Sequence, residues 1–187
     1  MPMLHSTNIY RRKASENVET PSRMDGVSCT VLDAETIHRF FEDRRAQVFT
    51  RFLQRGYFGI ALVLESQFVA YAWMTTPQSQ APPHLPARWK RRHWIFYCHT
   101  AESFRGRGLY QVCLKTLVER VARTHGHEDI YIDTTTSNTA SRRAIMRVGF
   151  EPCGVVSYLK LPRLRPILAR WNHHQNHPPI EQREAKS

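Results

Sequence analysis

The sequence predicts a single domain of the mixed α/β class, in which helices flank a central twisted sheet with both antiparallel and parallel strands. Two β-rich runs between residues 57 and 76 are separated only by the polar letters ESQ, which is typical of an antiparallel hairpin. After residue 93, strand and helix patterns alternate, and this order requires crossover connections and parallel pairing. A chain of 187 residues can bury one sizeable core and suits one domain.

The first half of this domain contains one strand, one helix and the hairpin. Residues 27–33 (VSCTVLD) have the composition of a short strand. From residue 34 to about residue 54, apolar side chains recur at helical spacing, and Gly56 follows as a stop signal. After the hairpin, a proline-rich loop is expected over residues 77–92.

The second half begins with a strand at residues 93–100 (HWIFYCHT), which we expect to be buried on both faces because aromatic residues lie on both. The next elements are a helix that ends at Gly126, a strand at 129–135, a helix at 137–148 and a strand at 150–161. Ser137 or Asn138 is the expected N-cap of the second helix, and Gly149 is its stop signal.

Polar segments enclose the predicted domain of residues 27–161. Residues 1–26 carry mixed charges with Pro21 and Gly26, so they are expected to be a flexible leader. Residues 162–187 are interpreted as a basic, histidine-containing tail. We predict no metal site, because a solvated tail explains the cluster of His173, His174 and His177 more simply and the four cysteines stand far apart without a CxxC pair.

The chain is strongly basic, with 27 Lys and Arg against 16 Asp and Glu and a formal net charge of +11. Nucleic acid, a membrane surface, an acidic substrate and a phosphorylated cofactor all fit this charge. No apolar run approaches the roughly 20 residues that span a bilayer, and the first residues lack the apolar core of a secretory signal. We therefore expect a cytoplasmic protein.

A glycine-rich turn offers the most specific indication of chemistry. The letters RGRG at residues 105–108 follow a strand that ends at Thr100, and they open a helix. The first amides of a helix have no intrahelical partner and lie at the positive end of its dipole. Two glycines let an anion approach the backbone closely, so a pyrophosphate is the expected ligand. The Lys and Ser/Thr of a Walker loop and the three glycines of a dinucleotide fingerprint are both absent here.

Together with its surroundings, this turn resembles the GNAT N-acetyltransferase superfamily. The resemblance lies in FRGRGL at 104–109, a following helix and strand, Asn138, and the Gly149–Phe150 pair. Arg105 and Gly108 match the glycine motif of the family, whereas Tyr110 stands where the family has Gly or Ala. The resemblance implies a mainly antiparallel mixed sheet in which one parallel strand pair splays apart.

The resemblance also implies acetyl-CoA as co-substrate, with its pyrophosphate on the glycine turn and its pantetheine arm along the strand that ends near Thr100. The cofactor contacts implied in this way are Thr100, Arg105, Gly106, Arg107, Gly108, Leu109, Tyr110 and Asn138. For Asn138, capping of the following helix is an equal alternative.

Candidate catalytic groups follow less directly. Many relatives have a tyrosine seven residues after the motif asparagine, but that place holds Ile145, which cannot act as a general acid. His99 has an ordinary pKa suited to a base, and Glu102 could hold a water molecule in the turn. A packed sheet residue and a carboxylate that only stabilises the helix N-terminus are the respective alternatives. Cys98 is interpreted as a buried thiol and not as a nucleophile.

The sequence therefore predicts an acetyl-CoA-dependent N-acetyltransferase that acylates the primary amine of a small molecule directly, such as an amino sugar or an amino acid derivative. Its acceptor region is expected within residues 34–56 and 77–92. Acetylation of a protein or peptide, or a non-catalytic module that binds acyl-CoA or an anionic partner, remains an alternative. Nucleic acid is not expected, because the basic stretches lack the stacking pattern of an RNA-binding sheet. A homodimer that shares its sheet is left open.

Overall fold

The computed structural model of the protein describes residues 3–14, 24–80, 91–126, 128–160 and 169–173. The strands are β1 (Met3–Lys13), β2 (Val27–Val31), β3 (Phe58–Leu64), β4 (Gln67–Thr75), β5 (His93–Thr100), β6 (Asp129–Thr135), β7 (Glu151–Lys160) and β8 (Ala169–His173). The helices are α1 (Ala34–Phe40), α2 (Asp43–Gln54), α3 (Leu109–His125) and α4 (Thr139–Arg147), with a short 3-10 turn, η2 (Glu102–Phe104).

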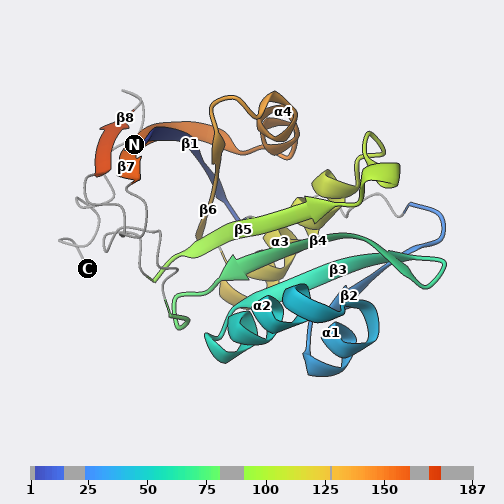
Figure 1. Cartoon of the computed structure of the whole chain (residues 1–187). Helices are drawn as coiled ribbons and strands as arrows, with labels where there is room; N and C mark the ends of the chain where they lie inside the picture. Colours follow the sequence, from blue (N-terminus) through green and yellow to red (C-terminus); the bar gives the residue numbers. More distant parts are fainter. Residues whose placement is uncertain (1–2, 15–23, 81–90, 127, 161–168, 174–187) are drawn as a thin grey trace.

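Within these residues, eight strands form one sheet in the order β2-β3-β4-β5-β6-β1-β7-β8. Helices α1 and α2 cover one face of the sheet, and α3 with α4 covers the other (Figure 1). The mixed sheet flanked by helices that the sequence predicts is thus confirmed. None of the helices in the described parts of the chain is long and apolar enough to cross a membrane.

The first half of the sheet is an antiparallel meander of β2, β3, β4 and β5. The predicted hairpin is present as β3 and β4, joined by a turn at Glu65 and Ser66 with φ of 47° and 64°. Two central residues with positive φ match the right-handed twist of the flanking strands, so the hairpin closes tightly.

Strands β5 and β6 form the predicted parallel pair, and they separate soon after they meet. The pairing covers His93 with Ile130, Trp94 with Tyr131, and Ile95 with Ile132. In the rest of its described length, β5 is not paired with β6, which leaves an opening in the middle of the sheet at the carboxyl ends of both strands. Ligand sites in sheets of this kind lie at such openings.

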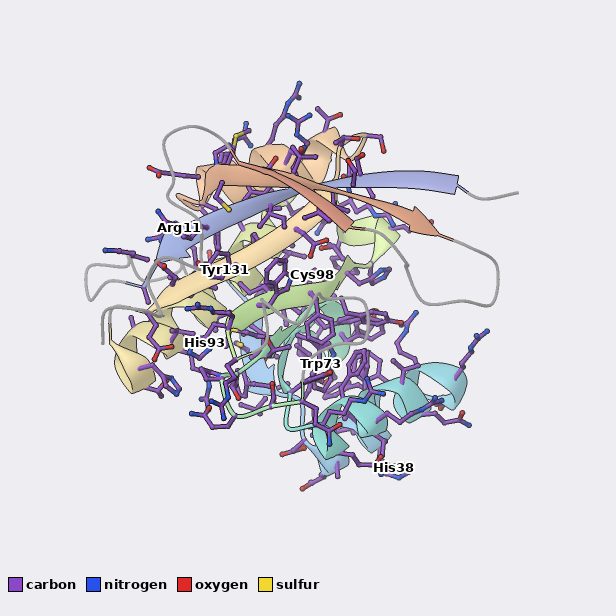
Figure 2. The ribbon with its side chains drawn as sticks, turned by 90° about the vertical axis from the view of Figure 1, so that its left-hand side faces the viewer. Arg11, His38, Trp73, His93, Cys98 and Tyr131 are labelled. Atoms are coloured by element: carbon purple, nitrogen blue, oxygen red, sulfur yellow. The ribbon has the colours of Figure 1, made fainter. Side chains whose placement is uncertain are left out.

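The prediction of a flexible leader over residues 1–26 is wrong for residues 3–13. Strand β1 lies antiparallel between β6 and β7 and pairs along both edges, with Arg11 beside Tyr131 (Figure 2). Ile9 and Tyr10 are each 1% exposed. Pairing on both edges and the burial of these two residues stabilise β1, although its charged sequence has no hydrophobic pattern typical of a strand. Because β1 intervenes, β6 and β7 run parallel without being neighbours.

The expected tail of residues 162–187 also contributes to the sheet. Its residues Ala169–His173 form β8, which pairs antiparallel with β7. The sheet therefore extends past the predicted domain end at residue 161. His174 and His177 lie outside the described residues, so the interpretation of the histidine cluster stays a prediction.

The helix expected from residue 34 to residue 54 is two helices. Phe41 separates α1 from α2 with extended backbone angles, φ −131° and ψ 132°. Its ring is 3% exposed and lies 4.8 Å from the ring of Phe49 and 4.7 Å from that of Phe68, centroid to centroid. Because the chain leaves the helical conformation at Phe41, its ring can be buried against the sheet. The free energy gained by this burial outweighs that of the helical hydrogen bonds that are lost.

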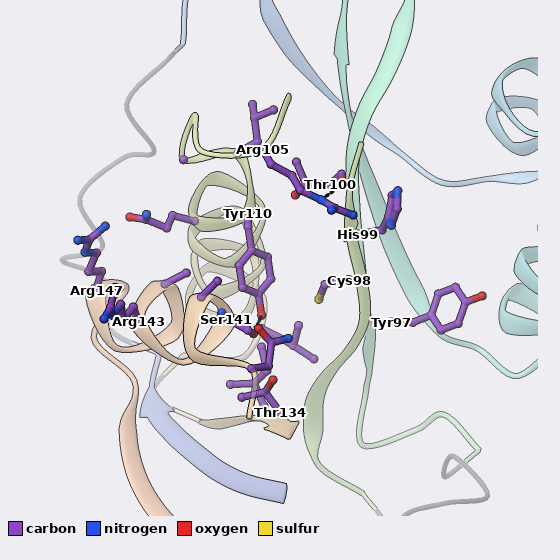
Figure 3. A pocket seen from close by; sticks show the side chains of 18 of the residues that line it. Tyr97, Cys98, His99, Thr100, Arg105, Tyr110, Thr134, Ser141, Arg143 and Arg147 are labelled. Carbon is purple, nitrogen blue, oxygen red and sulfur yellow. Dashed lines mark hydrogen bonds between the residues drawn. The ribbon is translucent and has the colours of Figure 1, made fainter. Parts of the chain in front are cut away.

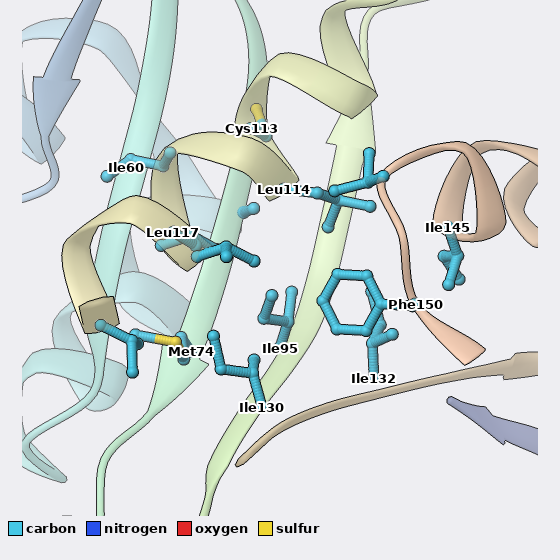
Figure 4. Close-up of a cluster of buried hydrophobic side chains, with 14 of the residues drawn as sticks. Ile60, Met74, Ile95, Cys113, Leu114, Leu117, Ile130, Ile132, Ile145 and Phe150 are labelled. Atoms are coloured by element: carbon cyan, nitrogen blue, oxygen red, sulfur yellow. The ribbon is translucent and has the colours of Figure 1, made fainter. Parts of the chain in front are cut away.

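Two apolar clusters hold the helices to the sheet. Beneath α3 and α4, the side chains of Leu114, Leu117, Ile95, Ile145 and Phe150 pack together (Figure 4). On the opposite face, an aromatic cluster under α1 and α2 contains Phe41, Phe49, Tyr57, Tyr71 and Trp73. His38 of α1 lies at the outer surface, far from this core (Figure 2).

Candidate active site

A cavity of about 770 Å³ opens where β5 and β6 separate. Its lining comes from the end of β5, the turn that opens α3, the end of β6 and one face of α4 (Figure 3). Among the residues singled out from the sequence, those that line it are His99, Thr100, Arg105, Gly106, Gly108, Leu109, Tyr110 and Asn138. The structure thus gathers most of the expected site around one opening.

A bulge in β5 directs side chains to both sides of this opening. Tyr71 pairs with His99 while Trp73 pairs with Phe96, so β5 carries one extra residue, and Tyr97 has a φ of 49°. Tyr97 and His99 consequently point to one side of the strand, and Cys98 points to the other, toward Tyr110 (Figure 3). Bulges commonly re-aim side chains beside functional sites.

The same bulge corrects the expectation that residues 93–100 are buried on both faces. Trp94 and Ile95 are completely buried, in agreement with it, but Tyr97 is 48% exposed. The end of the strand faces the opening instead of a covering helix.

The glycine turn presents free backbone to the cavity. Gly106 and Gly108 have φ of 80° and 77°, and a Cβ at either position would meet nothing within 4 Å. Gly108 caps α3 without a side-chain hydrogen bond. The amides of Leu109, Tyr110 and Gln111 in the first helical turn are therefore left for an outside acceptor, at the positive end of the helix dipole. This donor set suits a phosphate group.

Arginines add positive charge around the turn. Arg105 lines the cavity and donates from Nε to the carbonyl oxygen of Thr100 at 3.4 Å. Arg143 and Arg147 of α4 line it as well (Figure 3). These two arginines were not predicted as site residues from the sequence. They are four residues apart in the helix that Asn138 caps, and this spacing places them on the same helix face. Arg107, an expected cofactor contact, does not line the cavity; its guanidinium lies 5.1 Å from the ring centre of Phe104.

Tyr110 departs most from the expected pattern, since its ring extends into the cavity where a small residue was expected (Figure 3). Its hydroxyl oxygen lies 3.2 Å from Oγ of Ser141 on α4. Burial is the main cause that raises the pKa of Tyr110 well above its usual range, so the phenol keeps its proton. Burial also raises the pKa of the neighbouring Cys98 thiol to about 12. A neutral thiol is a poor nucleophile.

Asn138 holds the start of α4. Its side-chain oxygen accepts a hydrogen bond from the backbone N–H of Ser141 at 3.1 Å, so Asn138, and not the other candidate Ser137, is the N-cap residue. The side chain also lines the cavity. Ile145, about two helical turns further along the chain, is completely buried in the core and does not line the cavity.

The two candidate bases differ sharply. His99 lines the cavity and stacks on Tyr71 at 5.3 Å between ring centres. Burial, and then the charges of Arg45 and Arg105, lower the pKa of His99, which favours the neutral imidazole that a base requires. Glu102 does not line the cavity; its side chain is 84% exposed and forms an ion pair with Arg105 at 3.3 Å. We therefore keep only His99 as a candidate base.

A second cavity of about 710 Å³ lies on the opposite side of the sheet, beside α1 and α2. Its lining includes Phe41, Arg45 and Phe68, and it shares Tyr97 with the first cavity. A molecule in this second cavity therefore approaches β5 from the side to which His99 points. The second expected acceptor segment, residues 77–92, lies mostly outside the described residues.

With the opening in the sheet and the glycine turn in place, the comparison with known families is direct. The model of the acetyltransferase (GNAT) family matches residues 29–150. The chain belongs to this family. Members of this family use acetyl-CoA as acetyl donor. Among the described residues, no group of three or more His, Cys, Asp or Glu side chains could hold a metal ion.

Solved structures share the fold at low sequence identity. A Drosophila protein matches with a TM-score of 0.62 and 11% identity over 87% of this chain and 52% of that chain. A GNAT-family acetyltransferase from Colwellia psychrerythraea matches with a TM-score of 0.55 and 14% identity, covering 80% of this chain and 54% of that one. AAC(6')-Iy, in complex with the bisubstrate analog CoA-S-monomethyl-acetylneamine, matches with a TM-score of 0.52 and 14% identity over 67% of this chain and 90% of that one.

The chain spans between 52% and 63% of the first three structures that it matches. No curated protein matches the chain.

Proposed function

We propose that this protein is an acetyl-CoA-dependent N-acetyltransferase that transfers the acetyl group directly to the primary amine of a small molecule. The observation that carries the proposal is the uncapped glycine turn at the opening between β5 and β6. There, Gly106 and Gly108 leave space for a ligand, and three amides of α3 lack intrahelical partners. Family membership supplies the donor that such a turn would bind.

The chain offers binding groups for the phosphates and for the pantetheine arm of acetyl-CoA. The backbone N–H groups of residues 106–111 would donate hydrogen bonds to the pyrophosphate, and the guanidinium groups of Arg105, Arg143 and Arg147 would neutralise phosphate charge. The backbone of β5 beyond Ile95, unpaired with β6 in the described sheet, would hydrogen-bond the amides of the pantetheine arm. The donor set and the space in this structure therefore fit the co-substrate.

When bound, acetyl-CoA supplies a thioester whose carbonyl carbon is attacked by the amine, so that a C–N bond forms and the C–S bond breaks. His99 takes the proton that the amine loses, because its lowered pKa keeps the imidazole neutral near pH 7. Tyr110 replaces the tyrosine that α4 lacks: its protonated hydroxyl donates a hydrogen bond to the departing sulfur. The sulfur leaves as a thiolate and takes its proton from solvent.

Titration calorimetry with acetyl-CoA tests the proposal. The intact chain is expected to bind, and Gly108→Asp is expected to lose binding, because a carboxylate at this cap opposes the pyrophosphate. Asp tolerates positive φ better than most residues and is a good N-cap, so this variant should fold. Gly108→Asn, which has nearly the same shape and also tolerates positive φ but carries no charge, serves as the control that keeps more of the binding. A folded intact chain that binds no acyl-CoA overturns the proposal.

Release of free thiol in the presence of amines separates an enzyme from a binding module. Binding of acetyl-CoA without any amine-dependent thiol release, across small amines and peptides, would favour the non-catalytic alternative.

A further inference from the structure

The residues that line the second cavity indicate which kind of acceptor it could bind, provided that the protein is the N-acetyltransferase proposed above. This cavity lies between the junction of α1 with α2 and the strands β4 and β5. Its lining residues are Arg39, Phe40, Phe41, Glu42, Arg44, Arg45, Val48, Phe68 and Tyr97. Tyr97 also lines the first cavity, so the two cavities meet at the bulge of β5. An acceptor in the second cavity can therefore present its amine to the thioester side of the sheet.

The lining is strongly positive. Three of its residues are arginines, and Glu42 is the single carboxylate among the lining residues that the structure describes. Arg45 has no ion pair with any described carboxylate; its guanidinium instead lies 5.5 Å from the ring centre of Phe68 and 5.9 Å from that of Tyr71. The aromatic faces hold Arg45 in place while its N–H groups stay available to a ligand.

Arg45 also lies close enough to His99, the candidate base, to influence its pKa. Tyr71, beneath Arg45, stacks on His99 at 5.3 Å and on Tyr97 at 6.1 Å between ring centres. The charge of Arg45 contributes to the lowered pKa of His99. A group bound at Arg45 therefore lies along the aromatic surface that leads to His99, within the span of a small molecule.

We propose that the acceptor is a primary amine that also carries a carboxylate, with an apolar or aromatic body, and that Arg45 binds the carboxylate. Arg–carboxylate pairing can be bidentate and fixes orientation, which would aim the amine at His99. The aromatic lining accommodates the body of such an amino acid. A polycationic acceptor, such as an aminoglycoside, would be repelled by the three arginines. Of the two acceptor classes that the sequence suggested, the cavity thus favours the amino acid derivative over the amino sugar.

Matched acceptors and two arginine variants test this inference. Acetylation of phenylalanine and of phenylalaninamide is compared, because the two have nearly the same shape and only the first has a carboxylate. In the intact protein, kcat/KM corrected for the deprotonated fraction of each amine is expected to be about 10- to 100-fold higher for the acid than for the amide, the order expected for a hydrogen-bonded charge pair. In Arg45→Gln, this ratio is expected to fall to within a few-fold of one.

Arg51→Gln is the matched control, since Arg51 lies on the same helix but lines neither cavity. It removes the same charge and is expected to keep the acid-to-amide ratio of the intact protein. An equal loss in both variants would mean that only the general positive field matters and would overturn a role for Arg45.

A binding measurement keeps the inference testable if neither compound is acetylated. N-acetylphenylalanine and its amide are titrated in the presence of CoA, and the acid is expected to bind tighter in the intact protein only. Absence of that preference overturns the inference. Acetyl transfer to cationic amines alone would also overturn it and leave the proposed function standing, whereas failure to bind acetyl-CoA would refute the function itself.

Discussion

The guanidinium group of Arg12 on β1 donates a hydrogen bond to the carbonyl oxygen of Val148, the residue that ends α4. A second link joins the same two elements, because Arg142 of α4 donates from Nε to the hydroxyl of Tyr10 at 3.2 Å. Helix α4 forms one side of the first cavity and presents Asn138 and Ser141 to it. The N-terminal strand therefore positions part of the candidate active site, although it contributes no lining residue of its own.

Arg12→Met is expected to destabilise the protein by about 1–3 kcal/mol, because it leaves the Val148 carbonyl without its charged donor. The free energy of unfolding, measured with urea, gives this value. Lys13→Met, at the exposed neighbouring position of β1, is the control and should change stability by less than about 0.5 kcal/mol. Equal effects of the two substitutions would contradict a specific role for Arg12.

Gly59→Ala should disrupt the aromatic cluster under α1 and α2. A Cβ at residue 59 would lie 2.7 Å from two ring atoms of Trp73, which is completely buried. We expect a loss of about 1–3 kcal/mol in the free energy of unfolding from this overpacking. Trp73→Phe provides space for the methyl group, so the double variant should be more stable than the sum of the single losses predicts. Simple additivity would show that the contact relaxes without strain.

Tyr110→Phe separates the hydroxyl from the ring. The ring still fills the cavity, so the Kd for acetyl-CoA should stay within a few-fold of the intact protein. Loss of the hydrogen bond to the departing sulfur should lower kcat on the order of 10- to 100-fold. Ser141→Ala removes the hydrogen-bond partner of the Tyr110 hydroxyl, but the hydroxyl keeps its proton. A smaller decrease in kcat than in Tyr110→Phe is therefore expected. An unchanged kcat in Tyr110→Phe would rule out the proposed role.

His99 should titrate below its ordinary pKa of about 6.5. Burial and the charges of Arg45 and Arg105 disfavour the imidazolium, so the neutral base persists to lower pH than in an exposed histidine. NMR titration of the ring signals, assigned with His99→Gln, measures this. In Arg45→Gln the midpoint should move upward, because one of the charges that lower the pKa is gone. A midpoint that moves downward or stays unchanged would contradict the assigned cause.

The middle of the fold could be predicted from the sequence because its signals are local. The apolar stripe of α3 ends at Gly126, and Asn138 caps α4, as expected. The hairpin and the splayed parallel pair also appear where the sequence places them. The signals for the helices, their caps and the hairpin lie within a few positions of one another, whereas the splay of the parallel pair was implied by the family resemblance.

The errors arise where distant contacts decide. β1 reads as a polar segment, and its partners lie in residues 129–160. Phe41 has helical spacing, yet burial against Phe68 of β4 draws it out of the helix.

The candidate site shows the same division. The glycine turn was recognised from four adjacent letters, and most of its residues do line the cavity. Arg143 and Arg147 were missed because the orientation of α4 depends on its packing against the sheet. Glu102 was included because it is close in sequence, but its side chain turns to solvent and to Arg105. The direction of a side chain in a turn cannot be read from spacing alone.

The position of β1 has a consequence for how the chain acquires its shape during synthesis. β1 precedes the other described strands in the chain, but both strands that it joins, β6 and β7, are made after residue 128. Until then its hydrogen-bonding groups have no native partner, and closing such a long separation slows folding. In the meander of β2 to β5, each strand pairs with the next strand in the chain, so its partners are available as soon as they are made. We expect the half of the protein that carries α4 to become ordered last, when β1 fits between β6 and β7.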